Sequence, residues 1–162
     1  MLAPAGRPKR SAKKAGRTKH AGKKAKATAA SAKKRAREFR VSHGGMSQFA
    51  TSGLRNYFEY RDLGIKAATS GKVVSHVIRV RPGQAPHGKW HWHDCEVQFV
   101  YVLKGWARFE YEGVGEVLMQ AGTCFYQPPK IRHREIGHSD DLEMLEVVFP
   151  ANFKTYTAKE LA

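Results

Sequence analysis

The sequence is poor in cysteine, in long apolar runs and in helical periodicity, and each scarcity excludes a class of protein. Two cysteines among 162 residues are too few for a scaffold held together by disulfides. No apolar run approaches the roughly 18 residues that a membrane-spanning helix needs, so no membrane partner is expected. No apolar segment follows the first basic residues, as a secretory signal would require. The expected localisation is therefore the reducing cytoplasm.

Acidic residues are almost missing from the first quarter of the chain. Residues 1–40 contain 15 Lys and Arg but only one acid, Glu38, which gives a formal charge of 15 − 1 = +14. Residues 41–162 contain the other 14 basic residues and 13 acids, which gives 14 − 13 = +1. A uniformly basic protein is thereby excluded. We expect a basic tail, residues 1–45, followed by a near-neutral domain, residues 46–162, that is long enough to bury a core.

The tail consists mainly of Ala, Lys, Gly and Ser, with hardly any large apolar residue before Phe39. Such a composition cannot offset the entropy lost on folding, so we expect the tail to be disordered on its own. Residues 1–40 can neutralise phosphates and thereby bind nucleic acid without sequence preference. A solvated tail without a partner, a transit peptide, and a translation start at Met46 that omits the tail are the alternatives.

From Ser47 onward, Gly, Pro, Asn and Asp separate short runs rich in β-formers, a pattern typical of a sandwich or barrel. No helical pattern is long enough for a β–α–β unit, so the predicted fold class is all-β with antiparallel strands. The stretch Leu63–Thr69 fits either a short helix or a loop. The predicted strands are Tyr57–Tyr60, Val73–Val80, Val97–Leu103, Ala107–Glu112, Glu116–Met119, Thr123–Gln127 and Leu142–Phe149.

One predicted strand is unusual in its composition. The run Val97–Leu103 reads VQFVYVL and is almost wholly apolar, so we expect it to be buried on both faces. Gln98 lies within this run, and a buried amide without a partner costs about 1–3 kcal/mol. Gln98 is therefore expected to have a hydrogen-bond partner or to bind a metal ion.

The strongest candidate site consists of histidines. His91 and His93 are two residues apart, and on a strand such residues point to the same side, so that both imidazoles can hold one cation. Imidazole suits Zn, Fe, Cu and Ni. A third histidine, His133, follows a turn that contains two prolines. A further histidine, His76, lies in a predicted strand and is a candidate for the wall of the same pocket, whereas His138 lies in a polar turn and is expected to be exposed.

The spacing of these groups resembles the two sequence motifs of the cupin family. In the first motif, His91 and His93 are followed by four residues, then Gln98, then six residues and Gly105. The family has an acidic ligand where this chain has Gln98. Glu96, two residues away, is the alternative ligand.

The second motif also keeps the family spacing. Gly122 is followed by five residues, then Pro128, and His133 comes five positions after that proline. Lys130 stands where the family has a glycine. The resemblance covers roughly residues 73–149.

The resemblance implies a small β-barrel or jelly roll with a mononuclear metal site formed by His91, His93, Gln98 and His133. It implies one divalent ion, with Fe as the first candidate and Zn, Mn, Ni and Cu as alternatives. The expected partner is a small organic substrate or ligand, and the expected reaction, if the protein is an enzyme, is metal-dependent dioxygenation. The alternative is a non-catalytic ligand-binding module tethered to nucleic acid by the tail. Family members commonly form homodimers, so a homodimer is expected. No catalytic residue is assigned.

Overall fold

The computed structural model describes residues 28–29, 31, 34, 39–45 and 47–159. The chain divides into two units, Met1–Arg37 and Glu38–Ala162, and the fold described below is that of the second unit. The predictions of a disordered tail and of nucleic-acid binding by residues 1–40 fall almost entirely outside the described residues. Within the part that is described, no helix is both long enough and apolar enough to cross a membrane.

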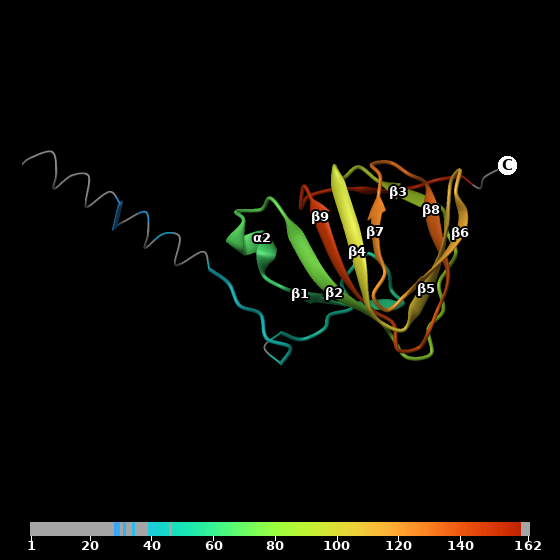
Figure 1. Cartoon of the computed structure of the whole chain (residues 1–162), viewed down its shortest axis with the longest axis horizontal. Coiled ribbons are helices and arrows are strands. Elements are labelled where there is room, and N and C mark those ends of the chain that lie inside the picture. The colour runs from blue at the N-terminus through green and yellow to red at the C-terminus, as the bar shows by residue number, and fades with distance from the viewer. Residues whose placement is uncertain (1–27, 30, 32–33, 35–38, 46, 160–162) are drawn as a thin grey trace, which may run out of the picture. The chain divides into compact units, whose positions relative to one another are not determined.

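The second unit is built from two antiparallel five-stranded sheets that face each other (Figure 1). One sheet has the strand order β1-β2-β9-β4-β7, and the other has the order β10-β3-β8-β5-β6. Most neighbours are not consecutive in the sequence, and this arrangement confirms the predicted all-β jelly roll. The elements are β1 (Phe58–Asp62), α2 (Ile65–Ala68), β2 (Val74–Val80), β3 (His91–His93), β4 (Val97–Lys104), β5 (Trp106–Tyr111), β6 (Gly115–Gln120), β7 (Cys124–Gln127), β8 (His133–His138), β9 (Glu143–Phe149) and β10 (Thr155–Thr157).

Each of the seven predicted strands corresponds to an observed strand, and Leu63–Thr69 contains the short helix α2. The prediction did not include β3, β8 and β10. Strands β3 and β10 have three residues each, which is too short for a period-two pattern to stand out. Strand β8 reads HREIGH, and its buried positions carry His133 and Glu135 instead of apolar residues.

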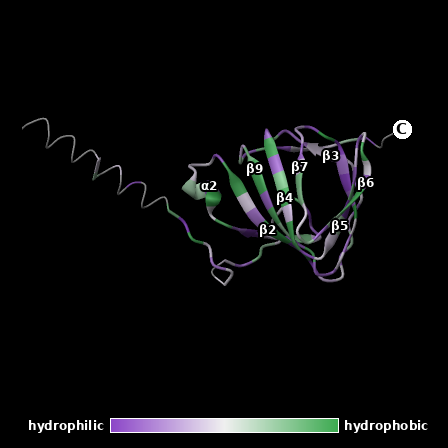
Figure 2. Cartoon of the chain, in the orientation of Figure 1, coloured by the Kyte–Doolittle hydropathy of each residue, from purple (hydrophilic) through white to green (hydrophobic). Residues whose placement is uncertain are grey.

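The hydrophobic core lies between the two sheets. Val102 of β4 and Ala107 of β5 are fully buried in one cluster that also contains Leu142 and Met144. Apolar residues run along β2, β4 and β9 in the first sheet (Figure 2). Burial of each large aliphatic side chain contributes about 1.5–3 kcal/mol, so these inner faces hold the sheets together. Buried polar side chains share the same inner space and form the site described below.

Strand β4 corrects one prediction. Its residues alternate between the two faces, and Val97, Tyr101 and Leu103 are 42%, 40% and 45% exposed. The prediction that both faces are buried is therefore wrong, because in the described chain only the inner face of this sheet is covered along β4. Gln98 lies on the inner face and is buried, as the sequence indicated.

The turn between β4 and β5 requires glycine. Gly105 has a φ of +68°, a conformation that costs residues with a Cβ about 1–2 kcal/mol. A Cβ at this position would lie 2.2 Å from Ser139 Oγ and 3.0 Å from Leu142 Cα. The chain therefore passes so close to the loop before β9 that no side chain fits.

We expect Gly105→Ala to lower the free energy of unfolding by about 2–5 kcal/mol, since backbone strain and overpacking add. The matched control is Gly113→Ala, because Gly113 has a φ of +73° but no heavy atom within 4 Å of the added Cβ. The control should cost only about 1–2 kcal/mol. Urea unfolding measures both values, and equal losses would show that the close approach at Gly105 is unimportant.

Candidate metal centre

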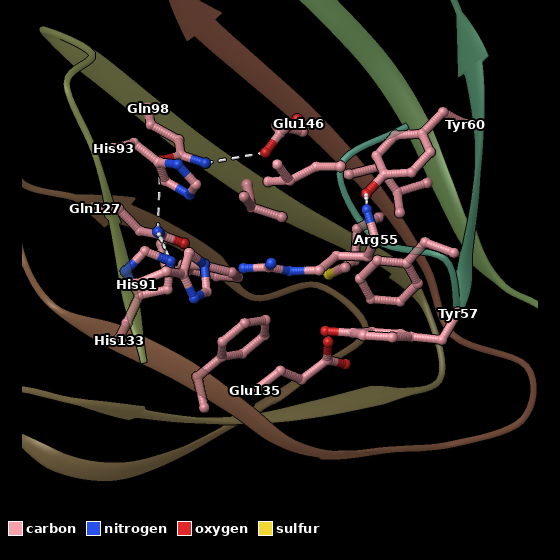
Figure 3. A pocket seen from close by; sticks show the side chains of 17 residues that line it. Arg55, Tyr57, Tyr60, His91, His93, Gln98, Gln127, His133, Glu135 and Glu146 are labelled. Carbon is pink, nitrogen blue, oxygen red and sulfur yellow. Dashed lines mark hydrogen bonds between the residues drawn. The ribbon is translucent and has the colours of Figure 1, made fainter. Parts of the chain in front are cut away.

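Three buried histidines converge on one point of the inner space. His91 and His93 project from the same face of β3, and His133 begins β8, where its Cα is paired with that of His91. One ring nitrogen of each histidine lies within 4.8 Å of those of the other two. The ring centroids of His91 and His133 are 4.2 Å apart, and those of His93 and His133 are 5.2 Å apart. Figure 3 shows the three rings together at one end of a cavity.

Hydrogen bonds fix the orientation of each ring. His91 Nδ1 lies 3.0 Å from the carbonyl oxygen of Lys89, and His133 Nδ1 lies 3.0 Å from that of Ile131. A carbonyl can only accept, so Nδ1 of both rings carries the proton and Nε2 keeps a lone pair. His93 Nδ1 lies 2.8 Å from Thr155 Oγ1 on the neighbouring strand β10. Such partners on the far ring nitrogen are typical of histidines that bind metals.

The three rings are neutral at ordinary pH. Burial lowers the pKa of His91 from 6.5 to about 2, and the neighbouring His133 ring and the charge of Arg55 contribute to this shift. Burial also lowers the pKa of His93 and of His133 to about 4, and the charge of Arg55 contributes in both cases. A metal ion therefore meets lone pairs without first displacing protons. Three neutral imidazole donors suit a divalent transition-metal ion.

Gln98 lines the same cavity, but neighbours hold its amide. Its Nε2 donates to Glu146 Oε1 at 2.9 Å. Its Oε1 has two long contacts, 3.5 Å from Gln127 Nε2 and 3.8 Å from Cys95 Sγ. The sequence indicated that this buried amide needs partners, and the structure supplies them. The carbonyl oxygen is the less firmly held end and is the atom that could bind a metal ion.

Gln127 is a residue of the site that the sequence analysis missed. It is buried at the end of β7, directly opposite Gln98 on β4. Its Nε2 lies 3.1 Å from His133 Nε2, and its Oε1 accepts a hydrogen bond from Tyr111 at 3.3 Å. The available signal was the pairing of β4 with β7, which places the two glutamines side by side.

Three other sequence predictions concern acidic and histidine side chains. Glu96, the alternative ligand, is exposed and does not line the cavity. His76 lines a neighbouring cavity instead, where its Nδ1 lies 3.7 Å from Glu146 Oε2. The prediction of an exposed His138 is wrong, since its side chain is only 3% exposed. Its Nδ1 lies 2.8 Å from Glu135 Oε1, because β8 continues through this histidine and turns it inward.

The far side of the cavity carries polar groups of a different kind. Arg55 and Tyr57 come from the segment before β1, and Glu135 comes from β8. The cavity encloses about 490 Å³ of space, including the part that is open to solvent. Burial raises the pKa of Tyr57, and nearby Glu135 raises it further, so the phenol stays protonated. No feature of the sequence distinguishes Arg55 from the other 28 basic residues.

The lowered histidine pKa values predict a pH-dependent stability of the metal-free protein. In the unfolded chain these imidazoles bind protons near pH 6.5, whereas in the fold they do so near pH 4 or below. The free energy of unfolding should therefore fall as pH decreases from about 6.5, by at most about 1.4 kcal/mol per pH unit for each histidine. His133→Asn should flatten this slope relative to His87→Asn, which alters an exposed histidine. Urea unfolding with a chelator, from pH 7 to pH 5, measures the slope, and an unchanged slope in His133→Asn contradicts the prediction.

Comparison with known proteins agrees with this geometry. Residues 76–148 match the model of the cupin domain family. No relative is found among curated proteins. The structure is similar to the polyketide cyclase RemF from Streptomyces resistomycificus, with a TM-score of 0.61 and 15% identity, covering 76% of this chain and 87% of the other.

Two metalloproteins are also similar in structure. One is oxalate decarboxylase from Bacillus subtilis, described for its Mn(II) centres, with a TM-score of 0.51, 21% identity, and coverage of 64% of this chain and 28% of the other. The second is the Fe(II) form of HppE, with a TM-score of 0.52, 15% identity, and coverage of 68% and 60%. At these identities the likeness concerns the fold alone. Residues 76–148, which lie within the jelly roll and include the converging histidines, thus form a cupin domain.

Proposed function

We propose that the chain binds one divalent transition-metal ion through His91, His93, His133 and Gln98, and uses it to act on a small organic molecule. The observation that carries this proposal is the convergence of three buried, neutral imidazoles within 4.8 Å. The Nε2 atoms of His91 and His93 have no described hydrogen-bond donor, and only His133 Nε2 has one, from Gln127. A bound ion would give the buried imidazoles a partner. The donor set is what a metal site requires.

The neutral donors determine the charge of such a site. Three imidazoles and the Gln98 amide leave a divalent ion its full +2 charge, whereas a carboxylate ligand would reduce it to +1. A more positive site attracts anions more strongly and polarises a bound carbonyl or water more strongly. An amide oxygen also binds an ion more weakly than a carboxylate does, so the affinity for metal should be modest.

We further propose Fe(II) as the ion and oxygenation as the reaction, with Zn, Mn, Ni and Cu as alternatives. When bound, an iron ion with open positions supplies the capacity to activate O₂ or to polarise a carbonyl. Support comes from the imidazole-rich donor set and from the Fe(II) and Mn(II) named for two similar structures. The chain's own residues orient the rings through their Nδ1 partners and line the remainder of the cavity with Arg55, Tyr57 and Glu135.

Metal content tests the proposal. The full chain, purified without a histidine tag and loaded with each candidate ion, should carry about one ion, and the double variant His91→Ala with His93→Ala should carry almost none. Gln98→Ala should lower the affinity by about tenfold or more, a magnitude typical of lost support at metal sites. Glu96→Ala and His87→Ala, which alter exposed residues, should behave as the wild type. Plasma mass spectrometry measures the content, and metal retained by the double variant would contradict the site.

A second candidate function rests on the charge of the N-terminal segment. Residues 1–40 carry a formal charge of 15 − 1 = +14, which suits binding to phosphates. In this alternative the cupin domain binds a ligand without catalysis, and the tail tethers it to nucleic acid.

The tethering function predicts DNA binding that depends on both the tail and salt. The full chain should bind duplex DNA with an affinity that falls steeply between about 50 and 200 mM salt. A chain that starts at Met46 should bind at least tenfold more weakly, because most of the positive charge is gone. Fluorescence anisotropy measures both affinities, and equal binding by the two chains excludes tethering by the tail.

We also propose a homodimer and a cytoplasmic location. The exposed apolar face of β4, with Val97, Tyr101 and Leu103, favours association with a second copy. Both cysteines are free thiols, as is usual for proteins of a reducing compartment.

A further inference from the structure

Arg55 enters the cavity from outside the two sheets. It belongs to the segment that precedes β1, and among the described residues it is the one Lys or Arg side chain that lines the cavity. In Figure 3 its side chain extends across the cavity towards His91 and His133. Its positive charge contributes to the lowered pKa of all three histidines. The guanidinium therefore lies close to the candidate metal centre.

The backbone of Arg55 is held in place. Its N–H donates to the hydroxyl of Tyr60 at 3.1 Å, and its carbonyl accepts from the N–H of Phe58 at 3.2 Å. Tyr60 is itself on β1, which is paired along its length with β2. The sheet thus fixes the backbone position from which the long side chain reaches inward.

The guanidinium lacks a full set of acceptors. Its Nη2 atom is buried and has no hydrogen-bond partner among the described residues. A buried donor without a partner costs about 1–3 kcal/mol, and more when it is charged. Glu135 Oε2 in the same cavity is also buried without a described partner. Unsatisfied charged atoms that face a shared cavity are the atoms that a ligand could satisfy.

The formal charges favour an anionic ligand once a metal ion is present. Arg55, Glu135 and Glu146 line the cavity, and their charges sum to +1 − 2 = −1. A divalent ion bound by neutral ligands changes this sum to +1. A ligand with one negative charge would then neutralise the cavity.

We propose that Arg55 binds the carboxylate of a small organic acid and directs the remainder of the molecule towards the histidines. Guanidinium binds carboxylate through two parallel hydrogen bonds, which fixes the orientation as well as the position of the ligand. The proposal names the substrate class of the site and rests on the proposed function, because the metal ion supplies the charge that makes the cavity favourable for an anion. Arg55 is accordingly a residue that determines specificity.

Binding of pyruvate and of its neutral amide, pyruvamide, tests this proposal. Isothermal titration of the full chain loaded with Zn(II) should show that Arg55→Gln weakens pyruvate binding by about 10- to 100-fold, the factor expected for a lost hydrogen bond between charged groups. Binding of pyruvamide should not change. Arg108→Gln is the matched control, because Arg108 is exposed on β5 and its substitution removes the same charge. It should change neither affinity.

Further measurements separate this proposal from its alternatives. Arg55→Lys keeps the charge but loses the planar fork, so it should bind pyruvate with intermediate affinity, and circular dichroism shows whether each variant is folded. If Arg55 serves only to pair with Glu135, Arg55→Gln lowers stability but leaves pyruvate binding unchanged, and the proposal is overturned.

Zinc content is measured in the same samples. Bound zinc without Arg55-dependent pyruvate binding overturns the role of Arg55 alone, whereas absent zinc overturns the metal site. If the loaded chain carries no zinc, and pyruvate binding is absent or does not depend on Arg55, then both the metal site and the role of Arg55 are overturned.

Discussion

The backbone pairing of His91 with His133 is the contact on which the site depends. Strand β3 has only three residues, and it is held between β8 and β10. Pairing across β3 and β8 brings two histidines that are 42 positions apart in the sequence to a ring separation of 4.2 Å. The two-residue spacing on β3 then adds His93 on the same face. The carbonyl groups of Lys89 and Ile131, each two residues before a histidine, set the tautomers of two rings. The cross-strand pair therefore brings the histidines together, and the two carbonyl groups determine which nitrogen His91 and His133 present to the cavity.

The rest of the cavity follows from the alternation of side chains in two facing sheets. Strands β4 and β9 each contribute apolar residues to the core and, along the same face, a polar residue of the site. On β4 the sequence Gln98, Val100, Val102 passes from the cavity into the core. On β9, Met144 lies in the core and Glu146 faces Gln98. Core and site are thus parts of one inner surface, and the apolar part provides the rigidity that the polar part requires.

The sequence predicts the parts of this site that depend on local spacing. The two-residue separation of His91 and His93 is such a local pattern, whereas the place of His133 in the site was predicted from the resemblance to the second cupin motif. The structure brings these three residues together. Arg55 and Gln127 could not be predicted, because their presence in the cavity depends on how distant strands pair. His138 was expected to be exposed because its neighbours in the sequence are polar, but strand β8 extends far enough to bury it. The outer face of β4 was expected to be buried because the run is almost wholly apolar. That expectation was wrong because an apolar sequence alone does not show whether anything covers the face.

The same groups that suggest a function also lower the stability of the fold when no ligand is bound. Burial has suppressed the charge of three histidines, and Arg55 Nη2 and Glu135 Oε2 lack described partners. Each is a local departure from a satisfied interior, and these groups line one cavity, whereas the third buried atom without a described partner, His76 Nδ1, lines a neighbouring cavity. Chance departures from good packing would not be expected to cluster around three converging histidines. A metal ion would bind the lone pairs of the rings, and an acid would satisfy the guanidinium. Binding would thus stabilise the fold, since a ligand that binds only the folded state shifts the unfolding equilibrium. Ligand binding would therefore offset the free energy of folding that is lost by burying these polar groups.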